Sequence, residues 1–169
     1  MGTLQHKKNS PANLRVAVIS VSSTRKLAED TSGAWIKKQA KKEGYEVVVH
    51  HVVDDDIEAI RELVERVATQ ISPDAILMTG GTGISPRDVT VEAVTPLFTK
   101  ELTAFAALFA QLSFEEIDSA AMLSRATAGI INKMVVFCMP GSLKACKLAC
   151  GNLIFPELGH VVAHISGAA

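Results

Sequence analysis

The sequence predicts an α/β fold with three layers, αβα, around a mainly parallel sheet, and three observations support this prediction. Short runs rich in β-branched residues alternate along the chain with longer amphipathic segments, which is the order of repeated strand–helix units. Apolar residues make up 48% and charged residues 21% of the chain, as in a globular domain. The length of 169 residues favours one domain. We therefore expect a single domain over 14–169, preceded by a disordered polar arm over 1–13.

The first half of the chain contains two strand–helix units. Residues 14–21 (LRVAVISV) predict a buried strand, and the segment 30–32 offers caps for the helix after it. Residues 45–53 (YEVVVHHVV) predict the second strand. Asp55 and Glu58 have the spacing of a capping box, so we expect them to open the next amphipathic helix.

The second half contains shorter strands and more turn residues. Residues 75–78 predict a strand that ends on a glycine-rich turn, and a mostly helical stretch is expected over 89–112. The last expected strand, 133–139 (KMVVFCM), is stopped by Pro140 before another helix. Parallel strands of this fold class bind ligands at their carboxyl ends. One site is therefore expected there, formed by the polar or glycine-rich segments 20–24, 53–56, 79–85 and 140–142.

Charge and cysteine content narrow the class of protein. Lys plus Arg number 17 against 18 Asp plus Glu, a balance that argues against a nucleic-acid binder. No apolar run approaches about 18 residues without a charge, which argues against a membrane span. Three cysteines with no secretory signal upstream indicate a reducing, cytoplasmic compartment. We expect reduced structural thiols at Cys138, Cys146 and Cys150.

A glycine-rich segment directly after the third strand is the strongest chemical signal. Glycine allows positive φ, which turns successive N–H groups into a concave site for phosphate or pyrophosphate, and hydroxyls add further donors. A tight strand-to-helix turn is the alternative. The segment matches neither the P-loop, which ends in Gly-Lys-Ser/Thr, nor the dinucleotide fingerprint, whose final glycine is Pro86 here. Its residues are Thr79, Gly80, Gly81, Thr82 and Gly83.

Carboxylates follow two of the expected strands. Asp88 lies five residues beyond Gly83, where a bound phosphate would repel it unless Mg²⁺ bridged the two. A helix cap is the alternative role for Asp88. The acidic run 54–56 is expected to provide at least one cap for the next helix, and it is also a candidate Mg²⁺ ligand.

Other polar residues are weaker candidates. Ser142 opens a helix after Pro140-Gly141, where free N–H groups can bind a second anion. Arg125, beside Ser124, is either a positioned anion ligand or an ordinary surface arginine. His160 and His164 are expected to be a solvated pair, because no third metal ligand is evident. The segment 101–112 (ELTAFAALFAQL) is apolar on more than one face, which favours homo-oligomerisation.

Several of these segments, in order, resemble the MoaB/Mog family of molybdenum cofactor biosynthesis proteins. The resemblance covers nearly everything from 15 to 160, and the MoaB branch fits better than the Mog branch. It implies a molybdopterin-binding fold assembled as trimers or hexamers. The segments that carry it are 78–90 (MTGGTGISPRDVT), 112–117 (LSFEEI), 119–129 (SAAMLSRATAG) and 139–142 (MPGS).

The resemblance also implies a reaction. Active members are molybdopterin adenylyltransferases, which transfer AMP from Mg-ATP to the terminal phosphate of molybdopterin and release pyrophosphate. By this resemblance, Asp55 and Asp88 match the family's two key acids, and both are expected to bind Mg²⁺. Asp54 replaces the family's proline, so three aspartates are alternatives for the first acid, with Asp55 preferred. The ligand-side residues implied are Asp30, Ser32, Gly33, Thr79 to Gly83, Ser124, Arg125, Pro140, Gly141 and Ser142.

Three functions are therefore open at the level of sequence. The first is the adenylyltransferase, with molybdopterin and ATP as substrates. The second is a non-catalytic carrier that holds molybdopterin for partner enzymes, among them a downstream molybdate or tungstate insertase. The third is nucleotide or pyrophosphate hydrolysis, as in competence-damage-type relatives. Nothing in the sequence chooses between molybdate and tungstate.

Overall fold

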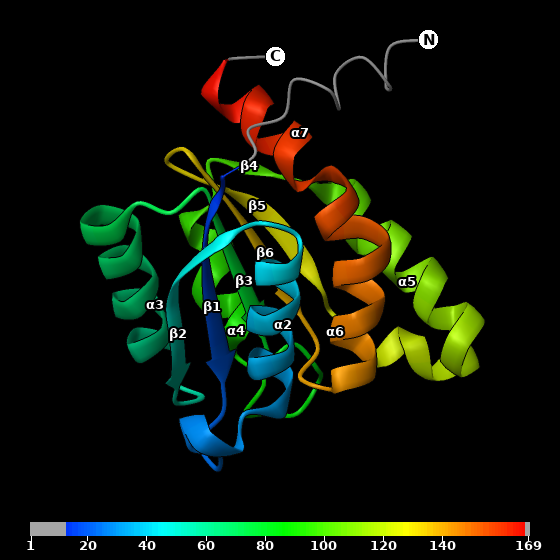
Figure 1. Cartoon of the computed structure of the whole chain (residues 1–169). Helices are drawn as coiled ribbons and strands as arrows, with labels where there is room; N and C mark the ends of the chain where they lie inside the picture. Colours follow the sequence, from blue (N-terminus) through cyan, green and yellow to red (C-terminus); the bar gives the residue numbers. More distant parts are fainter. Residues whose placement is uncertain (1–12, 168–169) are drawn as a thin grey trace, which may run out of the picture.

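A computed structural model describes residues 13–167, so the expected arm over 1–13 lies almost entirely outside the described residues. Six strands form one mixed sheet in the order β2-β1-β3-β6-β5-β4 (Figure 1). Four strands pair in parallel, and the last two pair antiparallel at one edge. The predicted α/β fold with a mainly parallel sheet is thus confirmed. The strands are β1 (Arg15–Val21), β2 (Glu46–Val53), β3 (Ala75–Thr79), β4 (Lys100–Glu101), β5 (Thr127–Ile131) and β6 (Met134–Met139).

Helices cover both faces of the sheet (Figure 1). Successive strand residues point to opposite faces, so Val16 and Val18 lie in one core cluster while Ala17 and Ile19 lie in the other. All four are fully buried, as expected for parallel strands covered on both sides. The first cluster is closed by α2 (Thr31–Lys42), α5 (Thr103–Ile117), α6 (Leu143–Ala149) and α7 (Phe155–Ser166), and the second by α3 (Ile57–Arg66) and α4 (Thr90–Val94).

The residue that caps α2 is the one expected from the sequence, whereas the cap of α3 lies one residue later than expected. Asp30 caps α2 by accepting a hydrogen bond from the Gly33 N–H, as expected. The cap of α3 is Asp56, whose side chain accepts from the Ala59 N–H. The capping box predicted from Asp55 is therefore wrong. The Asp55 side chain instead accepts a hydrogen bond from the Ser23 N–H.

The stretch 89–112 is mostly helical, as expected, but it is divided into separate helices. α4 ends at Val94, a 3-10 turn contains Pro96, and β4 precedes α5. Proline lacks the N–H that would continue the helix. β5 was not predicted, because Gly129 interrupts its β-branched pattern. The structure explains that glycine: a Cβ at Gly129 would overlap the ring of Phe98.

The last helices form one run, Leu143–Ser166, joined by a π-helical segment, Cys150–Ile154. This run is long and apolar enough to cross a membrane, by length and composition alone. The core helix of a soluble protein meets the same criteria. Here Cys146, Ile154 and Leu158 are fully buried in the first core cluster, so the run belongs to the core of the domain.

The three cysteines are free and buried, in agreement with the expected reduced thiols. Burial raises the pKa of Cys138 to about 12, so the thiol stays protonated at neutral pH. Cys146 lies behind the glycine-rich loop, with its Sγ 3.1 Å from Thr79 Oγ1. Buried, protonated thiols of this kind are structural groups.

Candidate active site

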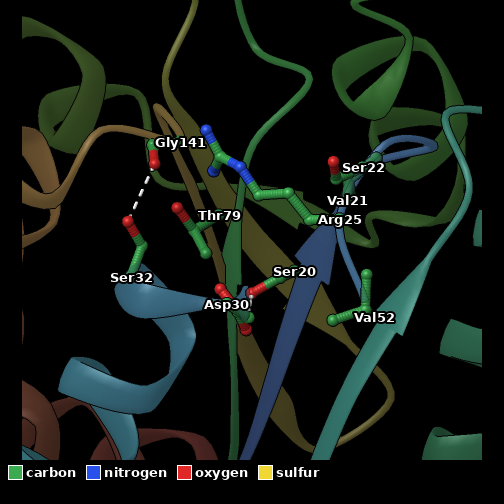
Figure 2. A pocket seen from close by; sticks show the side chains of 9 residues that line it. All are labelled: Ser20, Val21, Ser22, Arg25, Asp30, Ser32, Val52, Thr79 and Gly141. Atoms are coloured by element: carbon green, nitrogen blue, oxygen red, sulfur yellow. Dashed lines mark hydrogen bonds between the residues drawn. The ribbon is translucent and has the colours of Figure 1, made fainter. Parts of the chain in front are cut away.

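The predicted convergence of polar segments is present at the carboxyl end of the sheet. A pocket lies between the ends of β1 and β3, the first turn of α2 and the turn after β6 (Figure 2). The expected residues that meet there are Asp30, Ser32, Thr79 and Gly141. Ser20, Val21 and Ser22 also line the pocket and belong to the expected segment 20–24. The sequence did not single out the last two lining residues, Arg25 and Val52.

Asp30 forms the floor of this pocket. Its Oδ2 accepts a hydrogen bond of 2.7 Å from Ser20 Oγ and lies 3.0 Å from His50 Nε2, and its Oδ1 accepts from the Gly33 N–H. Burial by itself would raise the pKa of Asp30, but the bonds from Ser20, Gly33 and His50 together hold it below its ordinary value. A Cβ at Gly33 would clash with the Asp30 carboxylate. Asp30 is thus a buried anion that fixes Ser20 and the start of α2.

Two segments that are far apart in the sequence lie side by side above this floor. Thr79 Oγ1 donates to Pro140 O over 2.9 Å, and Gly80 N donates to Met139 O over 3.0 Å. Ser32 Oγ donates to Gly141 O over 2.9 Å, the bond drawn in Figure 2. These bonds tie the glycine-rich loop, the turn after β6 and α2 into one rigid rim.

The glycine-rich loop has the backbone of an anion-binding nest. Gly80 and Gly81 have φ of 99° and 65°, and a Cβ at Gly80 would clash with Val21 O. The carbonyls of both glycines accept hydrogen bonds from Thr90. Among the described residues, no protein acceptor receives the N–H groups of Gly81, Thr82 and Gly83. These three donors are therefore available to an anion.

Two hydroxyls beside this loop are buried without a partner in the described part of the chain. They are Thr82 Oγ1 and Ser124 Oγ, and Thr82 is only 2% exposed. A buried hydroxyl without a hydrogen bond costs about 1–3 kcal/mol, so such groups point to a missing ligand or water. The backbone joins them, since Arg125 N donates to Thr82 O over 2.9 Å.

Asp88 lies in a tight turn directly beside the nest. Its Oδ2 accepts from the Ser85 N–H over 2.8 Å, and a Cβ at Gly83 would lie 2.8 Å from the same oxygen. α4 begins two residues later without a side-chain cap, so the helix-cap alternative for Asp88 is wrong.

Arg125 clamps this turn from a distant part of the chain. Its Nε donates to Gly83 O over 2.7 Å and its Nη2 to Asp88 O over 2.8 Å. The guanidinium also pairs with Glu92, and hydrogen bonding from Arg125 lowers the pKa of that carboxyl. The sequence left two roles open for Arg125, an anion ligand or an ordinary surface arginine. In the structure the guanidinium binds protein groups instead, and Arg125 holds the glycine-rich loop in place.

The structure distinguishes the three consecutive aspartates. Asp54 is exposed, and Asp56 caps α3. Asp55 is half-buried and faces the loop after β1: its Oδ2 accepts from the Ser23 N–H over 2.7 Å, and its own N–H donates to Ser23 Oγ over 2.9 Å. Asp55 is thus the member of the run placed beside the pocket residue Ser22.

The acids fit Mg²⁺ that arrives with a phosphate. Among the described residues no group of three or more His, Cys, Asp or Glu could hold a metal ion. Mg²⁺ needs no such cage, because it commonly takes one or two carboxylates together with phosphate oxygens and water. In the described chain, Asp55 and Asp88 each use Oδ2 in a hydrogen bond and leave Oδ1 without one.

Three further polar residues lie near the turn after β6, and of these only Arg25 lines the pocket. Ser142 caps α6 by accepting from the Ala145 N–H, and Lys144 pairs with Glu116. Arg25, which the sequence did not single out, reaches across the pocket toward Gly141 (Figure 2). Among the described residues its guanidinium has no carboxylate partner, so it is the cation available to this pocket.

Comparisons of sequence and of structure relate this chain to several known proteins. The family of probable molybdopterin binding domains matches residues 17–160. Molybdenum cofactor biosynthesis protein B of Bacillus subtilis (strain 168) is 45% identical over 166 residues, which cover 98% of each chain. A solved structure of a molybdenum cofactor biosynthesis protein B superposes with a TM-score of 0.90 at 42% identity, covering 94% of this chain and 99% of that one. The tungsten cofactor synthesizing protein MoaB from Pyrococcus furiosus superposes with a TM-score of 0.81 at 38% identity, with coverages of 92% and 99%.

Proposed function

The chain belongs to the family of probable molybdopterin binding domains and acts in molybdenum cofactor biosynthesis, and from this premise we propose that it is a molybdopterin adenylyltransferase. One observation carries the proposal: the half-buried acid Asp88 lies beside an anion nest whose N–H donors have no partner in the described chain, and a second half-buried acid, Asp55, lies at the same end of the sheet. A carrier needs the nest but gains nothing from an acid beside it, because the carboxylate repels the bound phosphate.

The reaction joins two anions. A terminal phosphate oxygen of molybdopterin attacks the α-phosphorus of ATP, a new P–O bond forms, the bond between the α-phosphorus and the bridging oxygen breaks, and pyrophosphate leaves. The protein must hold both phosphates in line and neutralise their charge. The N–H groups of Gly81, Thr82 and Gly83 bind one phosphate, and Arg25 supplies positive charge across the pocket.

Asp55 and Asp88 would hold Mg²⁺, and the ion would supply positive charge that neutralises the reacting phosphates. The Oδ2 atoms keep each carboxylate fixed by a backbone N–H, from Ser23 and Ser85 respectively. The protein's own contribution is therefore positioning.

Purified protein with molybdopterin, ATP and Mg²⁺ tests the proposal through pyrophosphate release. We expect release from the wild type that requires molybdopterin, and a loss of about 10²-fold or more in Asp55→Asn and Asp88→Asn. Asp54→Asn is the matched control, because this neighbouring acid is exposed. Tight molybdopterin binding without pyrophosphate release would support the non-catalytic carrier. ATP breakdown in the absence of molybdopterin would support the hydrolase.

We also propose that the protein is a homo-oligomer. Five large apolar side chains are exposed on α5 and on the 3-10 segment after it, which is more than isolated surface residues require. They are Leu108, Phe114, Ile117, Met122 and Leu123. Light scattering after gel filtration measures the mass. A multiple of the chain mass is expected for the wild type and a smaller assembly for Phe114→Glu, whereas a monomeric wild type would contradict the proposal.

A further inference from the structure

The loop between β1 and α2 projects beyond the carboxyl end of the sheet (blue in Figure 1). Residues 23–29 are all exposed. In the described chain, residues 24–29 make hydrogen bonds only within the segment 22–30, for example from Lys26 N to Glu29 Oε2 over 3.1 Å. The loop can therefore move without breaking a hydrogen bond to the rest of the fold.

Both ends of this loop are firmly held. At its start, Ser22 N donates to Val53 O over 2.8 Å, and Ser23 exchanges two hydrogen bonds with Asp55. At its end, Asp30 is buried and is held by bonds from Ser20 and Gly33. Movement is therefore confined to residues 24–29, between two fixed points.

The loop borders two spaces of very different size. The pocket beside Arg25 has room for about 10 Å³, the volume of one water molecule, whereas pockets for small-molecule ligands usually measure about 300–1,000 Å³. An open hollow of about 710 Å³ lies between Leu27 and α2. Asp30 lines the pocket and His50 lines the hollow, and their contact of 3.0 Å lies between the two spaces. A substrate needs the pocket to widen, and the hollow gives the loop space to withdraw.

Arg25 is the side chain that closes the pocket. It extends from the loop across the pocket toward Gly141 (Figure 2). Among the described residues, its guanidinium has neither a carboxylate partner nor a hydrogen-bond acceptor. A guanidinium offers five N–H donors in a plane that matches the oxygens of a phosphate. Nothing in the described chain therefore holds Arg25 over the pocket, and a phosphate would supply its missing acceptors.

We propose that residues 24–29 form a lid, which opens to admit a phosphorylated substrate and closes when Arg25 binds the substrate's phosphate. The inference rests on the proposed function, because that function brings phosphorylated substrates to this pocket. A closed lid excludes water, which would otherwise compete with the pterin phosphate for the α-phosphorus of ATP. Arg25 is then a substrate ligand that is positioned only in the closed state.

Hydrogen exchange of the backbone amides tests the lid and does not depend on turnover. We expect fast exchange over 24–29 in the free protein, and slower exchange when saturating Mg-ATP or molybdopterin is added singly. The hairpin 131–134, at the opposite end of the sheet, should exchange at an unchanged rate.

Arg25→Ala separates the lid from simple burial by a ligand. This variant should bind the ligand about tenfold or more weakly and, even at saturation, should lack the slower exchange over 24–29. Lys26→Ala is the matched control, because Lys26 is an exposed cation of the same loop that lines neither the pocket nor the hollow. It should keep wild-type affinity and wild-type protection.

Two outcomes would overturn the lid: unchanged exchange over 24–29 in the wild type with both ligands, or full protection and wild-type affinity in Arg25→Ala. Pyrophosphate release by a wild type whose loop exchange never changes would sink the lid and keep the adenylyltransferase. Protection of the loop without pyrophosphate release would keep the lid and sink the adenylyltransferase.

Discussion

The two proposed catalytic acids are held by loops of different construction. Asp88 lies in a turn that is clamped through two carbonyls by Arg125, 37 residues later in the chain. Asp55 is held by a reciprocal pair of hydrogen bonds with Ser23, from the loop of the neighbouring strand. The difference follows from composition: a loop of glycines has no side chains to fix itself, so a distant side chain must fix it.

The largest effect on catalysis is therefore expected at Arg125, which holds the glycine-rich loop. Arg125→Ala removes the donors of Gly83 O and Asp88 O, and a displacement of about 1 Å in the loop can lower kcat about 10²-fold. Steady-state kinetics with molybdopterin and ATP measures this. Arg87→Ala, an exposed arginine in the same turn, should keep wild-type kcat. A rise in KM at constant kcat for Arg125→Ala would instead make Arg125 a substrate ligand.

A third acid sharpens the comparison, because Asp30 is structural. Asp30→Asn replaces an acceptor shared by Ser20 and His50 and should lower the free energy of unfolding by about 2 kcal/mol at pH 7. Urea unfolding measures this change.

The same residue predicts a pH dependence. Its pKa is lower in the folded protein than in the unfolded chain. Ionised Asp30 therefore contributes its full stabilisation of the fold at pH values above its pKa in the unfolded chain, near 3.9. This contribution is lost as the pH falls through the lower pKa of the folded protein. Below about pH 4 the wild type should lose this part of its stability, whereas Asp30→Asn should show a smaller acid dependence. Equal acid dependence of both proteins would contradict the anchoring role.

The smallest effect is expected at the pair of hydrogen bonds between Ser23 and Asp55. Ser23→Ala removes one hydroxyl acceptor and leaves the bond from the Ser23 N–H to Asp55. One neutral hydrogen bond corresponds to about 1 kcal/mol, or about fivefold in kcat. Thr24→Ala, beside it in the same exposed loop, should have no effect. A loss as large as that of Arg125→Ala would mean that both loops depend equally on side-chain clamps.

Features with local signals could be predicted from the sequence. The parallel strands β1, β3 and β6 are nearly continuous apolar runs, the glycine-rich loop follows β3 directly, and Asp55 lies two residues after β2. The long-range contacts left no such signal: Arg125 is one arginine among small residues, and Asp30, His50 and Ser20 meet only because α2, β2 and β1 pack together. β5 escaped prediction because Gly129 is required by Phe98, a contact that no local pattern contains.

The central claim is transfer of the α-phosphate, and ATP labelled at that position tests it most directly. With wild-type protein, molybdopterin and Mg²⁺, the label should appear in the adenylylated pterin, and the unlabelled pyrophosphate should form in equal amount. In Asp88→Asn, whose clamp residues are unchanged, the label should remain in ATP. Label that stays in ATP with the wild type while the pterin is bound, or that appears as free AMP without pterin, would contradict the account.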